Sequence, residues 1–117
     1  MADTEMREPT FLVLTALANG KKHGYALIKE ADELSGGRVS LKVGTLYAAL
    51  ERLGQQGLVA DAGEEVVDGR LRRYYKLTDE GAESLEREVT RLERNAGQAR
   101  ARLRVRPVSM HAAGGWA

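Results

Sequence analysis

The chain has 117 residues, of which 43% are hydrophobic and 30% charged, a composition that fits one small globular domain with little core to spare. It contains no cysteine, which excludes disulfide bonds and thiolate metal sites and favours a reducing compartment. The formal net charge is +1, so the bulk charge alone does not indicate nucleic-acid binding.

The first segment, MADTEMREPTFLVLTALANG, is acidic at its start and contains only a short apolar run. It fits neither a signal peptide nor a membrane span, so we expect a cytoplasmic protein that does not contact a membrane. Pro9 suits the first turn of a helix, and Asn19 with Gly20 suits its end. The helix between them is apolar nearly all round, which predicts burial on more than one side.

Two further helices are predicted from apolar residues at helical spacing. The segment HGYALIKEADELSGG carries one of them and ends in two glycines that stop a helix. The segment VSLKVGTLYAALERLGQQGLV carries the other, and two more glycines close it. One apolar stripe of this third helix is expected to face the core, and it consists of Val43, Leu46, Tyr47, Leu50 and Leu53.

A β-hairpin is expected after the third helix. Leu58 begins a short strand, Asp68-Gly69 is a strong hairpin signal, and RLRRYYKL is rich in strand formers. Because a lone hairpin is only marginally stable, we expect a two-stranded ribbon that leans on the helices. Tyr74 and Tyr75 alternate faces, so one should be in the core and the other exposed, and the spacing does not say which.

The last helix is predicted to start after Thr78, whose side chain can cap it, and to end near Pro107. It carries a regular a/d heptad seam made of Leu85, Val89, Leu92, Ala96, Ala99 and Leu103. We expect this seam to pack on a second copy of the chain; packing on the chain's own domain is the alternative. The Arg-rich end, residues 100–106, could contact DNA, the partner or solvent.

Three helices, a hairpin and a long helix predict a winged helix-turn-helix fold, mainly α with a small β-hairpin. We expect a DNA-binding domain over residues 1–77, a dimerisation helix over 78–106 and a flexible tail over 107–117. In such units the N-terminal residues of the second helix of the pair meet base edges in the major groove.

The small, polar and basic start of the third helix suits that task. Lys42 can reach a phosphate or a guanine, Thr45 can donate, accept or touch a thymine methyl, and Ala48 keeps the next turn thin. Arg70, at the hairpin tip, could enter a minor groove, whereas Arg72 and Arg73 would pair with phosphates.

Three blocks in this order, HGYALIKEADELSGG, VGTLYAALERLGQQGLV and GRLRRYYKLTDEG, resemble the PadR family of bacterial transcriptional regulators from Phe11 to Leu92. Members of that family are dimeric winged-helix repressors. Many control a neighbouring gene for a transporter or a detoxifying enzyme, and small molecules release some of them. The resemblance therefore implies a homodimeric repressor that binds double-stranded DNA at an inverted repeat, needs no cofactor, and has a possible small-molecule effector.

The residue patterns and the resemblance together give two sets of site residues. The start of the third helix matches the family's recognition helix, and the three arginines of the hairpin match its wing. The predicted DNA-binding residues are Ser40, Lys42, Gly44, Thr45, Tyr47, Ala48, Arg52, Arg70, Arg72, Arg73 and Tyr74. The predicted dimerisation residues are Phe11, Leu14, Leu85, Val89, Leu92, Ala96, Ala99 and Leu103.

The sequence also departs from the family pattern. Where the family often has Ser-Pro before the glycine of the recognition helix, this chain has Lys42 and Val43, so operator preference should differ. The wing often reads GRPRK, and here Leu71 replaces the proline. We expect no long C-terminal domain of the kind that the larger members have, so the chain resembles the short branch. Because the only Trp is residue 116 and the only Phe is residue 11, an effector site lined by aromatic side chains is not expected.

Three other classes of function have weaker support. Catalysis would need a base beside a nucleophile or paired carboxylates in an apolar context, and the only histidines are His23, at a helix start, and His111, so we expect no enzyme. A metal-responsive regulator would need ligand spacing that these histidines and the scattered acids lack. A protein-interaction module would use the heptad seam and leave the hairpin arginines without a purpose.

Overall fold

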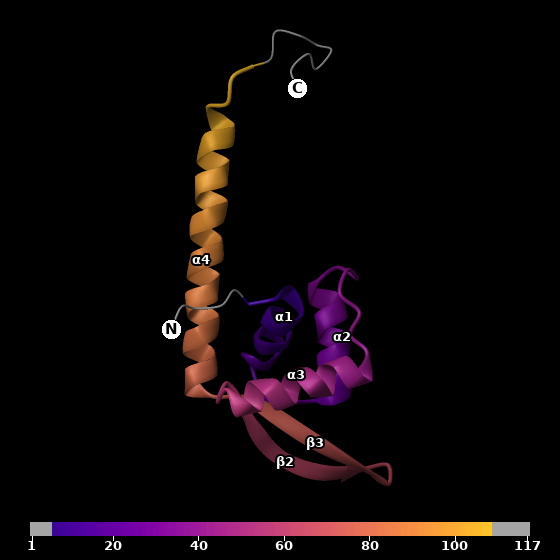
Figure 1. Cartoon of the computed structure of the whole chain (residues 1–117). Helices are drawn as coiled ribbons and strands as arrows, with labels where there is room; N and C mark the ends of the chain where they lie inside the picture. The colour runs from indigo at the N-terminus through magenta and orange to yellow at the C-terminus, as the bar shows by residue number, and fades with distance from the viewer. Residues whose placement is uncertain (1–5, 109–117) are drawn as a thin grey trace.

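The structure is a computed structural model that describes residues 6–108, and it confirms the winged helix-turn-helix arrangement with a long last helix (Figure 1). The first three helices lie together, the strands lie beneath α3, and α4 extends away from them. In chain order the elements are α1 (Glu8–Leu17), β1 (Lys22–His23), α2 (Gly24–Leu34), α3 (Val43–Gln55), β2 (Val59–Val67), β3 (Arg70–Leu77) and α4 (Asp79–Arg104).

The core lies between the first three helices and the base of the sheet. α1 contributes most to it and is buried over nearly its whole circumference, as its apolar composition predicts. Leu14 of α1 has no exposed surface, so it has none to offer to a partner, and its assignment to a dimer contact does not hold. The buried apolar residues are Leu12, Val13, Leu14, Ala16, Leu17, Leu27, Ala31, Leu41, Leu46, Leu50, Leu53 and Val59.

The sheet has three antiparallel strands in the order β1-β3-β2, whereas the sequence predicted two. The additional strand is the two-residue β1, in which Lys22 pairs with Tyr75 and His23 pairs with Tyr74. β1 covers the edge of β3 that β2 leaves free only at Tyr74 and Tyr75.

The hairpin turn is tight. Val67 pairs with Arg70, so only Asp68 and Gly69 form the loop, and both have positive φ angles, 51° and 76°. This is the geometry that an Asp-Gly pair favours, because its twist matches that of the strands on either side. The hairpin therefore ends in a compact tip, and Arg70 is the first residue beyond it.

α4 begins as predicted. Thr78 Oγ1 accepts a hydrogen bond from the Gly81 amide at 2.9 Å and donates one to the Gly57 carbonyl oxygen at 2.6 Å. The helix ends at Arg104, two residues before the predicted boundary.

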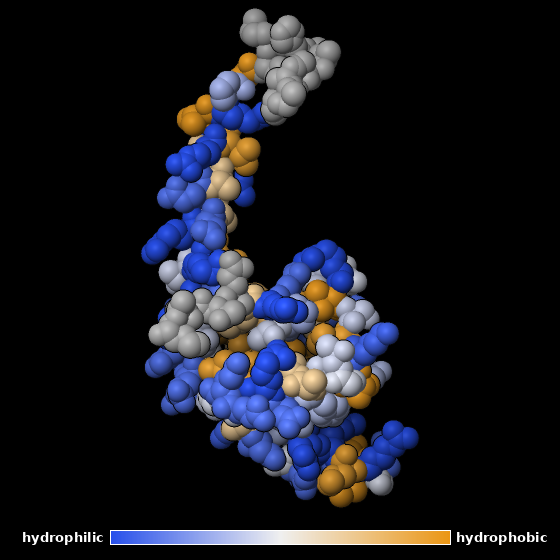
Figure 2. All heavy atoms as spheres, viewed as in Figure 1, coloured by the Kyte–Doolittle hydropathy of each residue, from blue (hydrophilic) through white to orange (hydrophobic). Residues whose placement is uncertain are grey.

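The heptad seam of α4 divides into two parts. Leu85 is half-buried against the chain's own core, whereas Leu92 and Leu103 are 42% and 63% exposed. Figure 2 shows hydrophobic side chains among charged ones along the distal part of the helix. Packing on the chain's own domain thus accounts for the first turns of α4 and leaves the distal seam in solvent.

Candidate nucleic-acid interface

α3 is the helix predicted to read DNA, and one side of it is firmly anchored. Leu46, Leu50 and Leu53 are almost fully buried. Val43 and Tyr47 were predicted to share this apolar stripe, but they are 61% and 44% exposed, so the prediction is wrong for these two residues. The side chains on three successive turns suffice to hold the helix, and its first turn projects beyond the core.

The start of α3 presents small and polar groups to solvent. Lys42 is the N-cap residue, and its side chain makes no capping hydrogen bond. A Cβ added at Gly44 would meet nothing within 4 Å, so the space in front of this turn is open. The predicted residues Ser40, Lys42, Gly44, Thr45 and Ala48 are all exposed.

Tyr47 connects α3 to two other elements. Its ring centroid lies 6.4 Å from that of Tyr75 on β3, and its hydroxyl lies against Gly24, the first residue of α2. A Cβ at Gly24 would lie 2.4 Å from this hydroxyl oxygen, so only glycine fits there without a shift of the tyrosine. The sequence analysis missed Gly24, because the residues that approach it are more than 20 positions away.

His23 has a structural role at the start of α2. Its Nδ1 atom accepts a hydrogen bond from the Ala26 amide at 3.3 Å and so caps the helix. Burial, and then the nearby charge of Arg72, lower the pKa of the imidazole. A neutral His23 is the form that can accept this bond, because both ring nitrogens are donors in the protonated form.

The wing arginines differ in their surroundings. Arg73 forms an ion pair with Glu64 across the hairpin, with 3.1 Å between Nη2 and Oε2. Arg72 lies opposite Glu65 in the backbone register of the two strands. Arg70, beyond the tip, makes no ion pair with any residue between 6 and 108. Within the described residues the wing therefore offers Arg70 without an acidic partner, whereas Arg73 is held by Glu64.

Both wing tyrosines are half-buried, so the expectation of one exposed residue is wrong. Tyr75 packs against the core, and burial raises the pKa of its hydroxyl. Tyr74 lies on the other face of β3, where its ring meets the His23 ring edge-on at 5.7 Å and the Lys21 ammonium at 5.0 Å. Its hydroxyl donates to Glu65 Oε1 at 2.6 Å, and this bond raises the pKa of the Tyr74 hydroxyl.

Arg52, which the sequence placed among the DNA-binding residues, is engaged within the chain. Its Nη2 donates to Thr10 Oγ1 on α1 at 3.1 Å. Residues 6–108 contain no group of three or more His, Asp or Glu side chains placed to hold a metal ion. His111 and the predicted tail beyond residue 108 lie outside the described residues.

The described helices include none that is long and apolar enough to span a membrane.

Comparisons with known proteins identify relatives in sequence. The profile of the "Transcriptional regulator PadR-like family" matches residues 13–87. The chain is 40% identical over 81 residues to transcriptional regulator Rv3488 of Mycobacterium tuberculosis. The matched stretch covers 69% of this chain and 72% of that protein. It is also 44% identical over 87 residues to an uncharacterized 37.1 kDa protein in transposon TN4556 of Streptomyces fradiae. This match covers 74% of the present chain but only 24% of the length of that protein.

The fold is shared with solved structures. A PadR family transcription regulator from Clostridium difficile has a TM-score of 0.69 and 26% identity, with coverage of 83% of this chain and 99% of that one. PadR of Bacillus subtilis, solved in complex with operator DNA, has a TM-score of 0.63 and 24% identity, and the match covers 71% of this chain and 47% of that one. Because the family profile spans more than half of the chain, the conclusion is direct: the chain belongs to the PadR-like family of transcriptional regulators.

Proposed function

We propose that this protein is a sequence-specific DNA-binding repressor that works as a homodimer. The observation that carries the proposal is the exposed, small and polar start of α3, which stands free of the core that anchors the rest of the helix. The family membership and the operator complex of the Bacillus subtilis relative support it.

In this proposal the first turns of α3 enter the major groove. Gly44 and Ala48 leave room for close approach, Thr45 contacts a base edge or a thymine methyl, and Lys42 contacts a guanine or a phosphate. Tyr47 presents its exposed edge to the DNA backbone from its position between α2 and the sheet. Arg70 enters the adjacent minor groove from the wing tip.

α4 provides the dimer contact, and its distal half supplies the most exposed large apolar side chains of the helix. Leu92 and Leu103 are large apolar side chains left in solvent on one stripe, together with Ala96 and Ala99. A second copy of the chain, with the same stripe, would remove these side chains from water.

The charges of α4 favour an antiparallel pair. Residues 79–93 contain six acids and two arginines, whereas residues 94–104 contain four arginines and no acid. The helix dipole explains charges only in the first and last turns, so it does not account for the whole pattern. In an antiparallel pair each basic half lies along the acidic half of the partner, whereas a parallel pair would place like charges together.

A symmetric dimer of this kind reads an inverted repeat. Two copies of α3 would enter successive major grooves on one face of the duplex, with half-site centres about one helical turn apart. A small molecule that changes the angle between the two α4 helices would change the distance between the α3 copies and release the DNA. Since repression requires access to the chromosome, we place the protein in the cytoplasm.

Fluorescence anisotropy tests this function. The probe is a labelled duplex from directly upstream of the protein's own gene, titrated with excess random duplex competitor across a salt series. We expect tight binding that competitor does not displace and a steep loss of affinity with salt, because each phosphate contact releases counterions. Equal binding to probe and competitor would contradict sequence-specific repression at this site and favour a protein-interaction module.

A further inference from the structure

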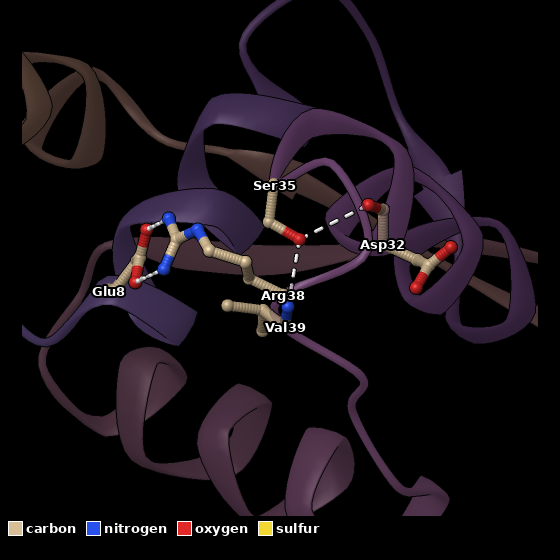
Figure 3. A network of polar contacts seen from close by, with 5 residues as sticks. All are labelled: Glu8, Asp32, Ser35, Arg38 and Val39. Carbon is tan, nitrogen blue, oxygen red and sulfur yellow. Dashed lines mark hydrogen bonds and ion pairs between the residues drawn. The ribbon is translucent and has the colours of Figure 1, made fainter.

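The first turn of α1 is tied to the turn that precedes α3. Arg38 Nη1 donates to Glu8 Oε1 at 3.1 Å, and Arg38 Nη2 pairs with Glu8 Oε2, so the contact is bidentate (Figure 3). The two residues are 30 positions apart in the sequence. The hydrogen bond from Arg38 lowers the pKa of the Glu8 carboxyl, which is therefore ionised at neutral pH.

The turn that carries Arg38 is closed by bonds of its own. Ser35 Oγ accepts from the Val39 amide at 2.9 Å and donates to the Asp32 carbonyl oxygen at 3.1 Å (Figure 3). These bonds fix the shape of the turn but connect it only to α2. The pair between Glu8 and Arg38 adds the connection to α1, two residues before the exposed Ser40.

The same turn of α1 also contacts α3 itself. Thr10 Oγ1 accepts a hydrogen bond from Arg52, which lies in the third turn of α3. Glu8 and Thr10 therefore hold the chain before α3 and the C-terminal half of α3. Between these two points lies the exposed first turn with Lys42 and Thr45.

We propose that Glu8 and Thr10 are positioning residues, which set the placement of α3 on DNA through Arg38 and Arg52 and do not touch the DNA themselves. The proposal rests on the DNA-binding function proposed above. α1 also packs against α4, so the two bridges connect the helix that carries the dimer contact to the helix that reads the sequence.

A different role for Arg38 makes the opposite prediction. Its side chain is 65% exposed, so it could instead contact a phosphate directly. In that case Glu8 would compete with the DNA for the guanidinium, and removing the carboxylate would strengthen binding. In a positioning role, removing the carboxylate loosens the turn and weakens binding.

The experiment compares Glu8→Gln, Arg38→Gln, their double variant and Thr10→Val with the wild type. The probe is the labelled duplex from upstream of the protein's own gene, and affinity is measured by anisotropy across a salt series. Glu33→Gln is the matched control, because Glu33 is also an exposed acid near this turn and its side chain has no partner within residues 6–108. Circular dichroism shows whether each variant remains folded.

A positioning role predicts that Glu8→Gln, Arg38→Gln and Thr10→Val each bind roughly threefold to fivefold more weakly, as the loss of a partly exposed polar bridge suggests. The salt slope should stay unchanged, the double variant should be no weaker than either single variant, and Glu33→Gln should bind like the wild type. Stronger binding by Glu8→Gln, or a slope reduced by about 1 in Arg38→Gln, would overturn the proposal in favour of a phosphate contact. Wild-type affinity in all the variants would overturn it as well.

A measurement without DNA separates this proposal from the function on which it rests. Amide hydrogen exchange at residues 38–42 should be faster in Glu8→Gln than in the wild type, while exchange within α2 stays the same. Unchanged exchange at these residues would contradict the bridge's role in holding the turn, whatever the DNA result. If the wild type binds no DNA but exchange at residues 38–42 is faster in Glu8→Gln, the result would instead contradict the proposed function and leave the bridge's role in holding the turn intact.

Discussion

Replacing Leu92 with glutamate should break the proposed dimer. Leu92 lies where the half-buried part of the α4 seam meets the exposed part, and 42% of it is in contact with solvent. Burial of a whole leucine side chain is worth about 2 kcal/mol, so covering the exposed part is worth about 0.8 kcal/mol in each chain. A symmetric dimer makes this contact twice, for about 1.6 kcal/mol in total.

The new carboxylate adds a second penalty, because it must either lose water at an apolar contact or hold the two helices apart. We expect a total loss of about 3 to 4 kcal/mol of association free energy, or a roughly 100-fold to 1,000-fold weaker dimer. Because 42% of Leu92 is already in solvent, the monomer should keep its helices.

Sedimentation velocity over a dilution series measures the dimer dissociation constant, and circular dichroism measures the helix content. Gln98→Glu is the matched control, because it adds the same charge to the distal half of α4 on the face away from the seam. An unchanged dissociation constant in Leu92→Glu, or an equal loss in Gln98→Glu, would refute the seam as the dimer contact.

Three further substitutions test the wing and the base of α4. Arg70→Ala should reduce the slope of log affinity against log salt by about 1, measured by anisotropy, and an unchanged slope would remove this contact from the wing. Glu64→Gln should strengthen binding to any duplex because it frees Arg73 from its ion pair, and unaltered affinity would show that Arg73 does not reach the DNA. Gly81→Ala places a Cβ 2.1 Å from the backbone carbonyl oxygen of Leu58. The free energy of unfolding should therefore fall by about 3 kcal/mol and the melting temperature by roughly 10 °C. An unchanged melting curve would contradict this packing.

Features with local causes could be predicted from the sequence. The tight turn at Asp68 and Gly69 requires positive φ angles that this pair adopts easily, and the Thr78 cap needs only an amide three residues further on. The helical repeat of α3 likewise identified Leu46 and Leu50 as core residues.

Features that depend on distant partners could not be predicted. β1 is two residues long, and it is a strand only because β3 pairs with it. Val43 and Tyr47 fit the apolar repeat of α3, but the neighbouring elements do not cover the first turn fully. The bridge between Glu8 and Arg38 joins two charged residues whose sequence context resembles that of any solvent-exposed pair.

One selection experiment tests the central claim most directly. The wild-type protein is used to enrich duplexes from a random-sequence pool, and the enriched sequences are read. A homodimer that reads DNA through two copies of α3 predicts one enriched inverted repeat with half-site centres about one helical turn apart, and a single half-site for Leu92→Glu. Enrichment of no sequence over the starting pool would contradict sequence-specific binding, and a single unrepeated site for the wild type would contradict the dimer.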